Sequence, residues 1–195
     1  FANGMVYVFF VLVITQFYEV GFETTVSLAG VSYGIGLSPE AFFGYLLGVE
    51  MLIALVSMAP AAKAAERVGL KPVVAVGFAV YALFPVVLIR GPEVLASVMP
   101  LSWAMILIFA FSGLRFAGLP SHKALIVGPA ERGAGGRVTG TYYLLRNAVV
   151  IPSAALGGYL WEFVSPGIAF TIAAVIGVIG TGYFLAFGEE FEAYV

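Results

Sequence analysis

Six long apolar stretches are the feature that most constrains how this chain can fold. They run roughly over 4–30, 41–60, 73–89, 100–127, 138–161 and 165–187. Most of them reach or approach the ~20 apolar residues that a helix needs to cross the hydrocarbon core of a bilayer. Backbone N–H and C=O groups inside lipid must bond to one another, and a helix satisfies them within one segment. The stretches therefore predict an all-α membrane protein, a single bundle of six transmembrane helices over residues 1–195.

Composition agrees with this class and excludes several others. Of the residues, 62% are hydrophobic and 10% are charged, whereas soluble domains have roughly 45–50% and 25%. The chain has no cysteine, no aspartate and one histidine, so we expect no disulfide, no cofactor, no protein-built metal site and no enzymatic activity. A net charge of −2 does not indicate nucleic-acid binding. The opening FANGMVYVFF has no initiator methionine and no signal-peptide pattern, so we expect a piece of a longer protein.

The basic residues predict the orientation in the membrane. Six of them lie in or near the loops 61–72 and 128–137, on one side of the bundle: Lys63, Arg67, Lys71, Lys123, Arg132 and Arg137. The loops of the other side contain only Arg90. Because cytoplasmic loops are enriched in Lys and Arg, we expect both basic loops and both termini to lie in the cytoplasm of a cell-membrane protein.

Apart from Lys123 near the cytoplasmic end of the fourth span, five charged residues lie inside the predicted spans: Glu19 and Glu23 in the first, Glu50 in the second, Arg115 in the fourth and Arg146 in the fifth. An ionisable side chain at membrane depth is costly and usually faces a cavity. The third and sixth spans carry no charge. We therefore predict that spans one, two, four and five surround a polar interior, with spans three and six outside.

These charges predict a pathway for a substrate or for protons. Glu19 and Glu23 are four residues apart, so they would share one helix face and could exchange a proton. Arg115 and Arg146 stay charged, so they could bind an anionic substrate or hold a glutamate ionised until a proton or ligand competes. Structural ion pairs that orient the helices are the competing interpretation, and Glu23 has a further one as an interfacial residue.

Polar and aromatic neighbours of these charges could contact a substrate that has both polar and apolar parts. They are Gln16, Tyr18, Tyr142, Tyr143 and Asn147. Helix packing is the alternative role for each. In the sixth span Ala169, Ala173 and Gly177 form a stripe of small residues, which predicts close helix packing. His122 has no acid nearby in sequence, so we expect it at the cytoplasmic interface and not in a nucleophile–base pair.

The segment AKAAERVGLKP, residues 62–72, resembles the loop signature G-x-L-A-D-R-x-G-R-[RK] of major facilitator superfamily transporters. Glu66 stands at the Asp position, and Arg67, Gly69 and Lys71 match directly. Ala62 and Leu70 depart from the pattern. With these departures, the segment is similar to the weaker copy of the signature that is found between the eighth and ninth helices of the family.

A second stretch, GLRFAGLP to GGYLW over 113–161, resembles the tenth helix, cytoplasmic loop and eleventh helix of prokaryotic members of the family. The resemblance covers nearly the whole chain and implies one six-helix half, a 3+3 repeat, of the twelve-helix fold. We expect the C-terminal half. Pro152 precedes Gly157 by five positions, which departs from the antiporter signature P-x-x-G-G and argues against a drug antiporter.

The resemblance implies that the first and fourth helices line a central path and that the third and sixth lie outside. Members of the family rock two halves around a midplane site. We therefore expect a secondary transporter of a small organic solute, which could be coupled to protons. Its partner would be a second six-helix half, located upstream in the same chain or in a second copy. A transport-inactive scaffold or sensor of the same fold is the alternative. The solute and the direction of transport stay open.

The basic loop also predicts a cytoplasmic gate made of Lys63, Glu66, Arg67, Gly69 and Lys71. The acid can pair with a base or with the N-terminus of a neighbouring helix, and the glycine permits a tight turn. Pro72 is suited to the start of the next helix. We expect Glu66 and Arg67 to hold the cytoplasmic helix ends together in one access state.

Overall fold

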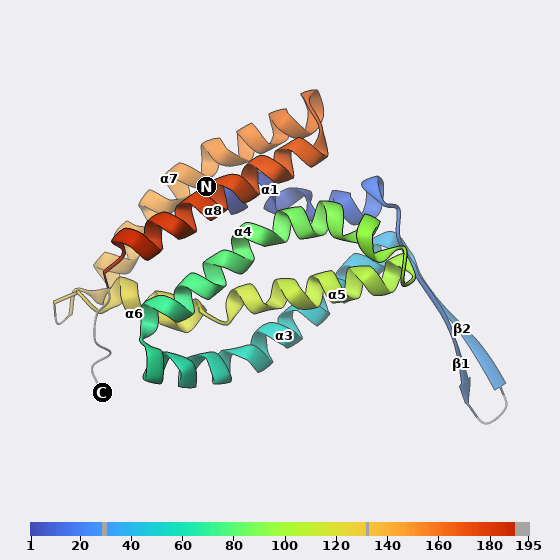
Figure 1. The fold of residues 1–195 in the computed structure, drawn as a ribbon, viewed down its shortest axis with the longest axis horizontal. Helices are drawn as coiled ribbons and strands as arrows, with labels where there is room; N and C mark the ends of the chain where they lie inside the picture. The colour runs from blue at the N-terminus through green and yellow to red at the C-terminus, as the bar shows by residue number, and fades with distance from the viewer. Residues whose placement is uncertain (29–30, 132, 190–195) are drawn as a thin grey trace.

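The computed structural model describes residues 1–28, 31–131 and 133–189, and it consists of helices with one β-hairpin at one end of the molecule (Figure 1). The longer helices are α3 Pro39–Val68, α4 Leu70–Leu95, α5 Leu101–Gly113, α6 Leu119–Val127, α7 Gly135–Phe163 and α8 Pro166–Phe187. The shorter elements are α1 Ala2–Val6, η1 Tyr7–Phe9, α2 Phe10–Leu12, η2 Val13–Phe17, β1 Phe22–Leu28, β2 Val31–Leu37 and η3 Leu114–Phe116.

Among the residues that the structure describes, four apolar helical segments are long enough to cross a membrane: Pro39–Val68, Leu70–Leu95, Leu101–Val127 and Pro166–Phe187. The third of these combines α5, η3 and α6. Helix α7 is also long, with 29 residues, but it contains Arg137, Arg146, Asn147 and Glu162 and is less apolar. The long apolar helices support the assignment to membrane proteins.

The prediction of a helix over 4–30 is wrong for its second half. Helical structure ends at Phe17, after short α, 3-10 and π turns, and Glu19 adopts a left-handed conformation with φ 47°. The chain then forms an antiparallel hairpin, in which Phe22 is opposite Leu37. The physical reason is local, since β-branched residues such as Thr24 and Thr25 favour extended structure. Hydropathy alone does not separate such a strand from the end of a helix.

The predicted loop 61–72 is almost entirely helical. Helix α3 continues through the charged segment to Val68, and α4 begins at Leu70. Alanine, lysine, glutamate and arginine are good helix formers, which explains why charge does not end the helix. Gly69 alone separates the two helices, with φ 93°, a value that glycine adopts without strain. The tight turn predicted at Gly69 is present, but its flanks are helix ends and not loops.

Helix α4 lies at the centre of the bundle, which contradicts the prediction that the third span lies outside. It packs against α3, α5, α6 and α8. Half of its most apolar window is buried, compared with 22% for α3 and 28% for α8. An uncharged span such as 73–89 can be buried against other helices as readily as it can face lipid, because both surroundings are apolar.

The stripe of small residues on α8 packs against α4, as predicted. Ala169 and Ala173 are fully buried. A Cβ added to Gly177 would lie 2.8 Å from the Cα of Ala82 on α4. The absence of side chains at this point allows the two backbones to approach closely, and α7 packs beside α8 on its other side (Figure 1).

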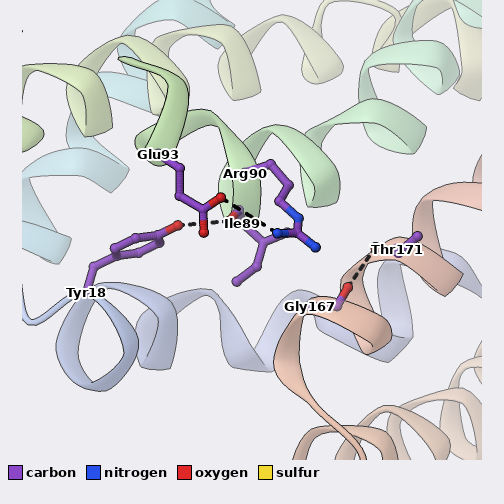
Figure 2. Close-up of polar contacts among 6 residues, drawn as sticks. All are labelled: Tyr18, Ile89, Arg90, Glu93, Gly167 and Thr171. Carbon is purple, nitrogen blue, oxygen red and sulfur yellow. Dashed lines mark hydrogen bonds and ion pairs between the residues drawn. The ribbon is translucent and has the colours of Figure 1, made fainter. Parts of the chain in front are cut away.

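A side-chain hydrogen bond attaches the end of the first helical segment to α4. Figure 2 shows the Tyr18 hydroxyl, which donates to the carbonyl oxygen of Ile89 at 2.8 Å, near the exposed pair Arg90–Glu93. In α8, the Thr171 hydroxyl donates to the carbonyl oxygen of Gly167 within its own helix. The Tyr18 bond is therefore a tertiary link between segments far apart in sequence.

Replacing Tyr18 by phenylalanine is expected to lower the free energy of unfolding by about 1 kcal/mol, because the ring is kept and one hydrogen bond is lost. Tyr45→Phe is the matched control, since Tyr45 is 52% exposed and its hydroxyl forms no hydrogen bond among the described residues. Unfolding curves in detergent would measure both variants. Equal stabilities of the two variants would contradict the prediction.

Candidate functional site

A buried ion pair joins α3 to the interruption between α5 and α6. The Nη2 atom of Arg115 lies 2.8 Å from Oε1 of Glu50, and the two side chains are only 2% and 3% exposed. The hydroxyl of Ser112 donates a hydrogen bond to the same carboxylate oxygen. Two charges buried among apolar helices require mutual pairing, because each alone would be strongly destabilising.

Aromatic rings surround the guanidinium group of Arg115. Its Cζ atom lies 4.8 Å from the ring centroid of Phe116, 5.1 Å from those of Tyr81 and Phe84, and 5.6 Å from that of Phe10. Such cation–π contacts stabilise the charge where water is excluded. Within the described part of the chain, Nε and Nη1 of Arg115 have no hydrogen-bond partner. The cation therefore keeps donors that a further group could use.

Two glycines allow the interrupted helix to reach its neighbours. A Cβ added to Gly113 would lie 2.6 Å from the carbonyl oxygen of Glu50, so α5 and α3 touch at the level of the ion pair. A Cβ added to Gly118 would lie 2.9 Å from the carbonyl oxygen of Val73 on α4. Between them the 3-10 turn Leu114–Phe116 carries Arg115. This close packing explains how Arg115 is held between α3 and α4.

Arg115 borders a cleft of about 340 Å³ at the meeting point of the first helical segment, α4, η3 and α7. The residues that line it are Asn3, Gly4, Tyr7, Val8, Tyr81, Arg115, Phe116, Arg146, Val150 and Ala154. Two of these ten residues are arginines and none is acidic. The cleft is therefore electropositive, with both apolar and hydrogen-bonding walls.

A cavity of about 490 Å³ shares part of its lining with this cleft, and Tyr142 and Tyr143 line it. The Tyr142 hydroxyl lies 3.2 Å from Nε2 of His122, which also contacts Phe78 edge to face. The partner of His122 is thus a tyrosine on α7. The sequence does not reveal the pair of His122 and Tyr142, because only the packing of α6 against α7 brings the two residues together.

Of the five charges predicted to share a polar interior, the structure brings together three. Glu50 and Arg115 form the ion pair, and Arg146 lines the same cleft as Arg115. Arg146 is exposed, and in the described chain its hydrogen bond goes to the neighbouring Asn147 at 3.3 Å. Gln16 and Asn147 are exposed and do not belong to the lining of the cleft or the cavity.

The prediction that Glu19 and Glu23 share a helix face with access to the same interior is wrong. Glu19 follows the last helical turn and Glu23 lies in β1, because the helix ends at Phe17. Both are exposed and line a separate groove of about 640 Å³ at the base of the hairpin, together with Ser102. The two acids do lie on one groove, but it contains neither arginine of the cleft.

The residues of the predicted gate lie at the junction of α3 and α4. Lys63, Glu66 and Arg67 are exposed, and within the described residues neither Glu66 nor Arg67 forms an ion pair. Lys71 is partly buried, and Arg132 lies outside the described residues. The latch between helix ends therefore stays a prediction.

Two members of the site were missed in the sequence. Ser112 precedes Arg115 by three residues and so lies on the same helix face, a signal that was available. Tyr81 was missed because the predicted span 73–89 carries no charge and was placed outside the bundle. Comparisons of the chain with protein-family profiles, with curated proteins and with solved structures found no match.

Proposed function

We propose that this chain is a six-helix unit of a secondary active transporter of the major facilitator type, which moves a small organic solute across a membrane by alternating access. The observation that carries the proposal is the buried Glu50–Arg115 pair, which borders an open cleft within a bundle of apolar helices. Buried ion pairs are poor devices for stability, and ionisable residues at membrane depth commonly mark transport pathways.

The position of the cleft supports the proposal. It is lined by parts of the first and fourth predicted spans, which line the central path of a major facilitator unit, and by part of the fifth, which flanks that path. Tyr81 of α4 adds a wall that the resemblance does not predict. A second six-helix unit, upstream in the same chain or in a second copy, would cover the open side, and rocking of the two units would expose the cleft to each face of the membrane in turn.

The ion pair also gives the transporter a candidate proton carrier. Glu50 is buried beside the cleft and pairs with Arg115, whereas Glu19 and Glu23 are exposed at the hairpin. Glu50 is therefore better placed for this role than Glu19 or Glu23.

Alternating access is testable without knowledge of the solute. The chain has no cysteine, so a single Ala154→Cys substitution places one thiol on the wall of the cleft. In membrane vesicles of both orientations that contain the full-length protein, we expect a membrane-impermeant maleimide to label this thiol from either face. Val98→Cys, which is 74% exposed between α4 and α5, is the control and should react from one face only.

Labelling of Ala154→Cys from one face alone would contradict alternating access. That result would favour the second interpretation, a membrane scaffold or sensor that keeps the fold but does not transport.

A further inference from the structure

The charges around the cleft do not balance. Glu50 contributes one negative charge, and Arg115 and Arg146 contribute one positive charge each, so −1 + 1 + 1 leaves a net charge of +1. No acidic residue is among the ten that line the cleft. An uncompensated cation beside a cleft in an apolar bundle favours an anionic occupant.

The hydrogen-bonding groups of the cleft also favour an anion. Arginine carries five N–H donors in a fork that matches a carboxylate. Nε and Nη1 of Arg115 have no partner in the described chain, although the side chain is only 2% exposed. Arg146 donates one hydrogen bond to the side-chain oxygen of Asn147. Asn3, Tyr7 and Tyr81 add neutral polar groups that could orient a ligand.

The rest of the lining is apolar. Val8, Phe116, Val150 and Ala154 contribute hydrocarbon surface to the cleft. Its volume of about 340 Å³ is near the lower end of the range of about 300–1,000 Å³ for small-molecule sites. A ligand that fills it is small, with one charged end and an apolar body.

We infer that the cleft binds a small monocarboxylate, with the carboxylate held by Arg115 and Arg146 and the apolar body against Phe116 and Val150. The inference rests on the proposed transporter function and names the class of its solute. One negative charge balances the net +1 of the three ionised side chains. A phosphate or a dicarboxylate would leave a surplus negative charge in surroundings of low dielectric constant.

Thermal stabilisation of the purified full-length protein tests the inference. The probes are acetate, butyrate and benzoate as monocarboxylates, benzamide as the uncharged counterpart of benzoate, succinate as a dicarboxylate and inorganic phosphate. We expect at least one monocarboxylate to raise the Tm with its concentration, and benzamide, succinate and phosphate to leave it unchanged. No effect of any monocarboxylate, equal effects of benzoate and benzamide, or a larger effect of phosphate or succinate would overturn the inference.

Matched variants locate the binding. Arg146→Gln is expected to weaken binding of the stabilising carboxylate about tenfold or more, because a charged hydrogen bond to the ligand is lost. Arg137→Gln removes the same charge from an exposed position of α7 outside the cleft, and it should leave the affinity unchanged. Equal loss in both variants would show general electrostatic attraction and would overturn the site. If Ala154→Cys is labelled from both faces but no carboxylate binds, this inference is refuted and the proposed transport is not. If a carboxylate binds but labelling occurs from one face only, transport is refuted and the site is not.

Discussion

Replacement of Glu50 by alanine is expected to lower the free energy of unfolding by about 3–5 kcal/mol, because it leaves the buried charge of Arg115 without a counterion. Arg115 is 2% exposed and arginine does not lose its proton in proteins, so the variant has no easy way to remove the charge. Only the surrounding aromatic rings would continue to stabilise the cation. Reversible unfolding in mixed detergent micelles would measure the change.

The exposed pair Arg90–Glu93 supplies the control for this experiment. Its atoms are 3.6 Å apart, and its side chains are 62% and 55% exposed. Glu93→Ala is therefore expected to cost less than about 1 kcal/mol, as is usual for ion pairs in contact with water. If Glu50→Ala and Glu93→Ala had similar effects, burial would not govern the energetics of the Glu50–Arg115 pair.

A double substitution separates pairing from packing. Glu50→Gln with Arg115→Met removes both charges and keeps much of the side-chain volume, so it is expected to be more stable than Glu50→Ala alone. If the buried pair serves function and not stability, the double variant should recover stability relative to Glu50→Ala and should lose carboxylate binding. Additive losses from the two single changes would contradict a direct coupling between the residues.

Replacement of Gly157 by alanine is expected to destabilise the protein by about 3 kcal/mol, because overpacking against a rigid backbone forces two helices apart. A Cβ at Gly157 would lie 1.8 Å from the carbonyl oxygen of Met5 and 2.7 Å from its carbonyl carbon. A backbone atom cannot move aside as a flexible side chain can. The contact joins α7 to α1, and half of the residues that line the cleft come from these two helices, so binding should weaken together with stability.

The next residue provides the matched control. A Cβ at Gly158 would lie 3.8 Å from the Phe9 ring, which is an ordinary contact distance. Gly158→Ala is expected to be neutral or to stabilise the helix by up to about 1 kcal/mol, because alanine has the higher helix propensity. Thermal unfolding of both variants would decide the point. Equal stability of the two variants would show that α1 does not pack against α7 as closely as the structure indicates.

Much of the framework could be predicted from hydropathy. The helices over 100–127 and 165–187 follow directly from apolar length, as do the positions of Glu50 and Arg115 within apolar helices. Hydropathy measures how strongly each stretch prefers lipid to water, and that preference is a local property of its residues. It therefore identified the long helices of a membrane protein and the unusual charges inside them.

Local signals failed where two structures have the same hydropathy. The stretch after Phe17 is apolar enough to continue a helix, yet it forms a hairpin, and this change removes Glu19 and Glu23 from the predicted interior. The charged segment before Gly69 is polar enough to form a loop, yet it continues α3. In both places backbone propensity decided the outcome, whereas polarity had suggested the alternative.

The sequence by itself determined which segments prefer an apolar environment and which charged residues lie inside them. Only the tertiary structure decided that Glu50 pairs with Arg115, that α4 with its uncharged span 73–89 is central, and that Arg146 shares a cleft with Arg115. The physical reason is that pairing depends on how closely helix backbones approach. That approach is set by contacts between distant glycines and their neighbours, such as Gly113 against Glu50 and Gly157 against Met5, which hydropathy and spacing do not encode.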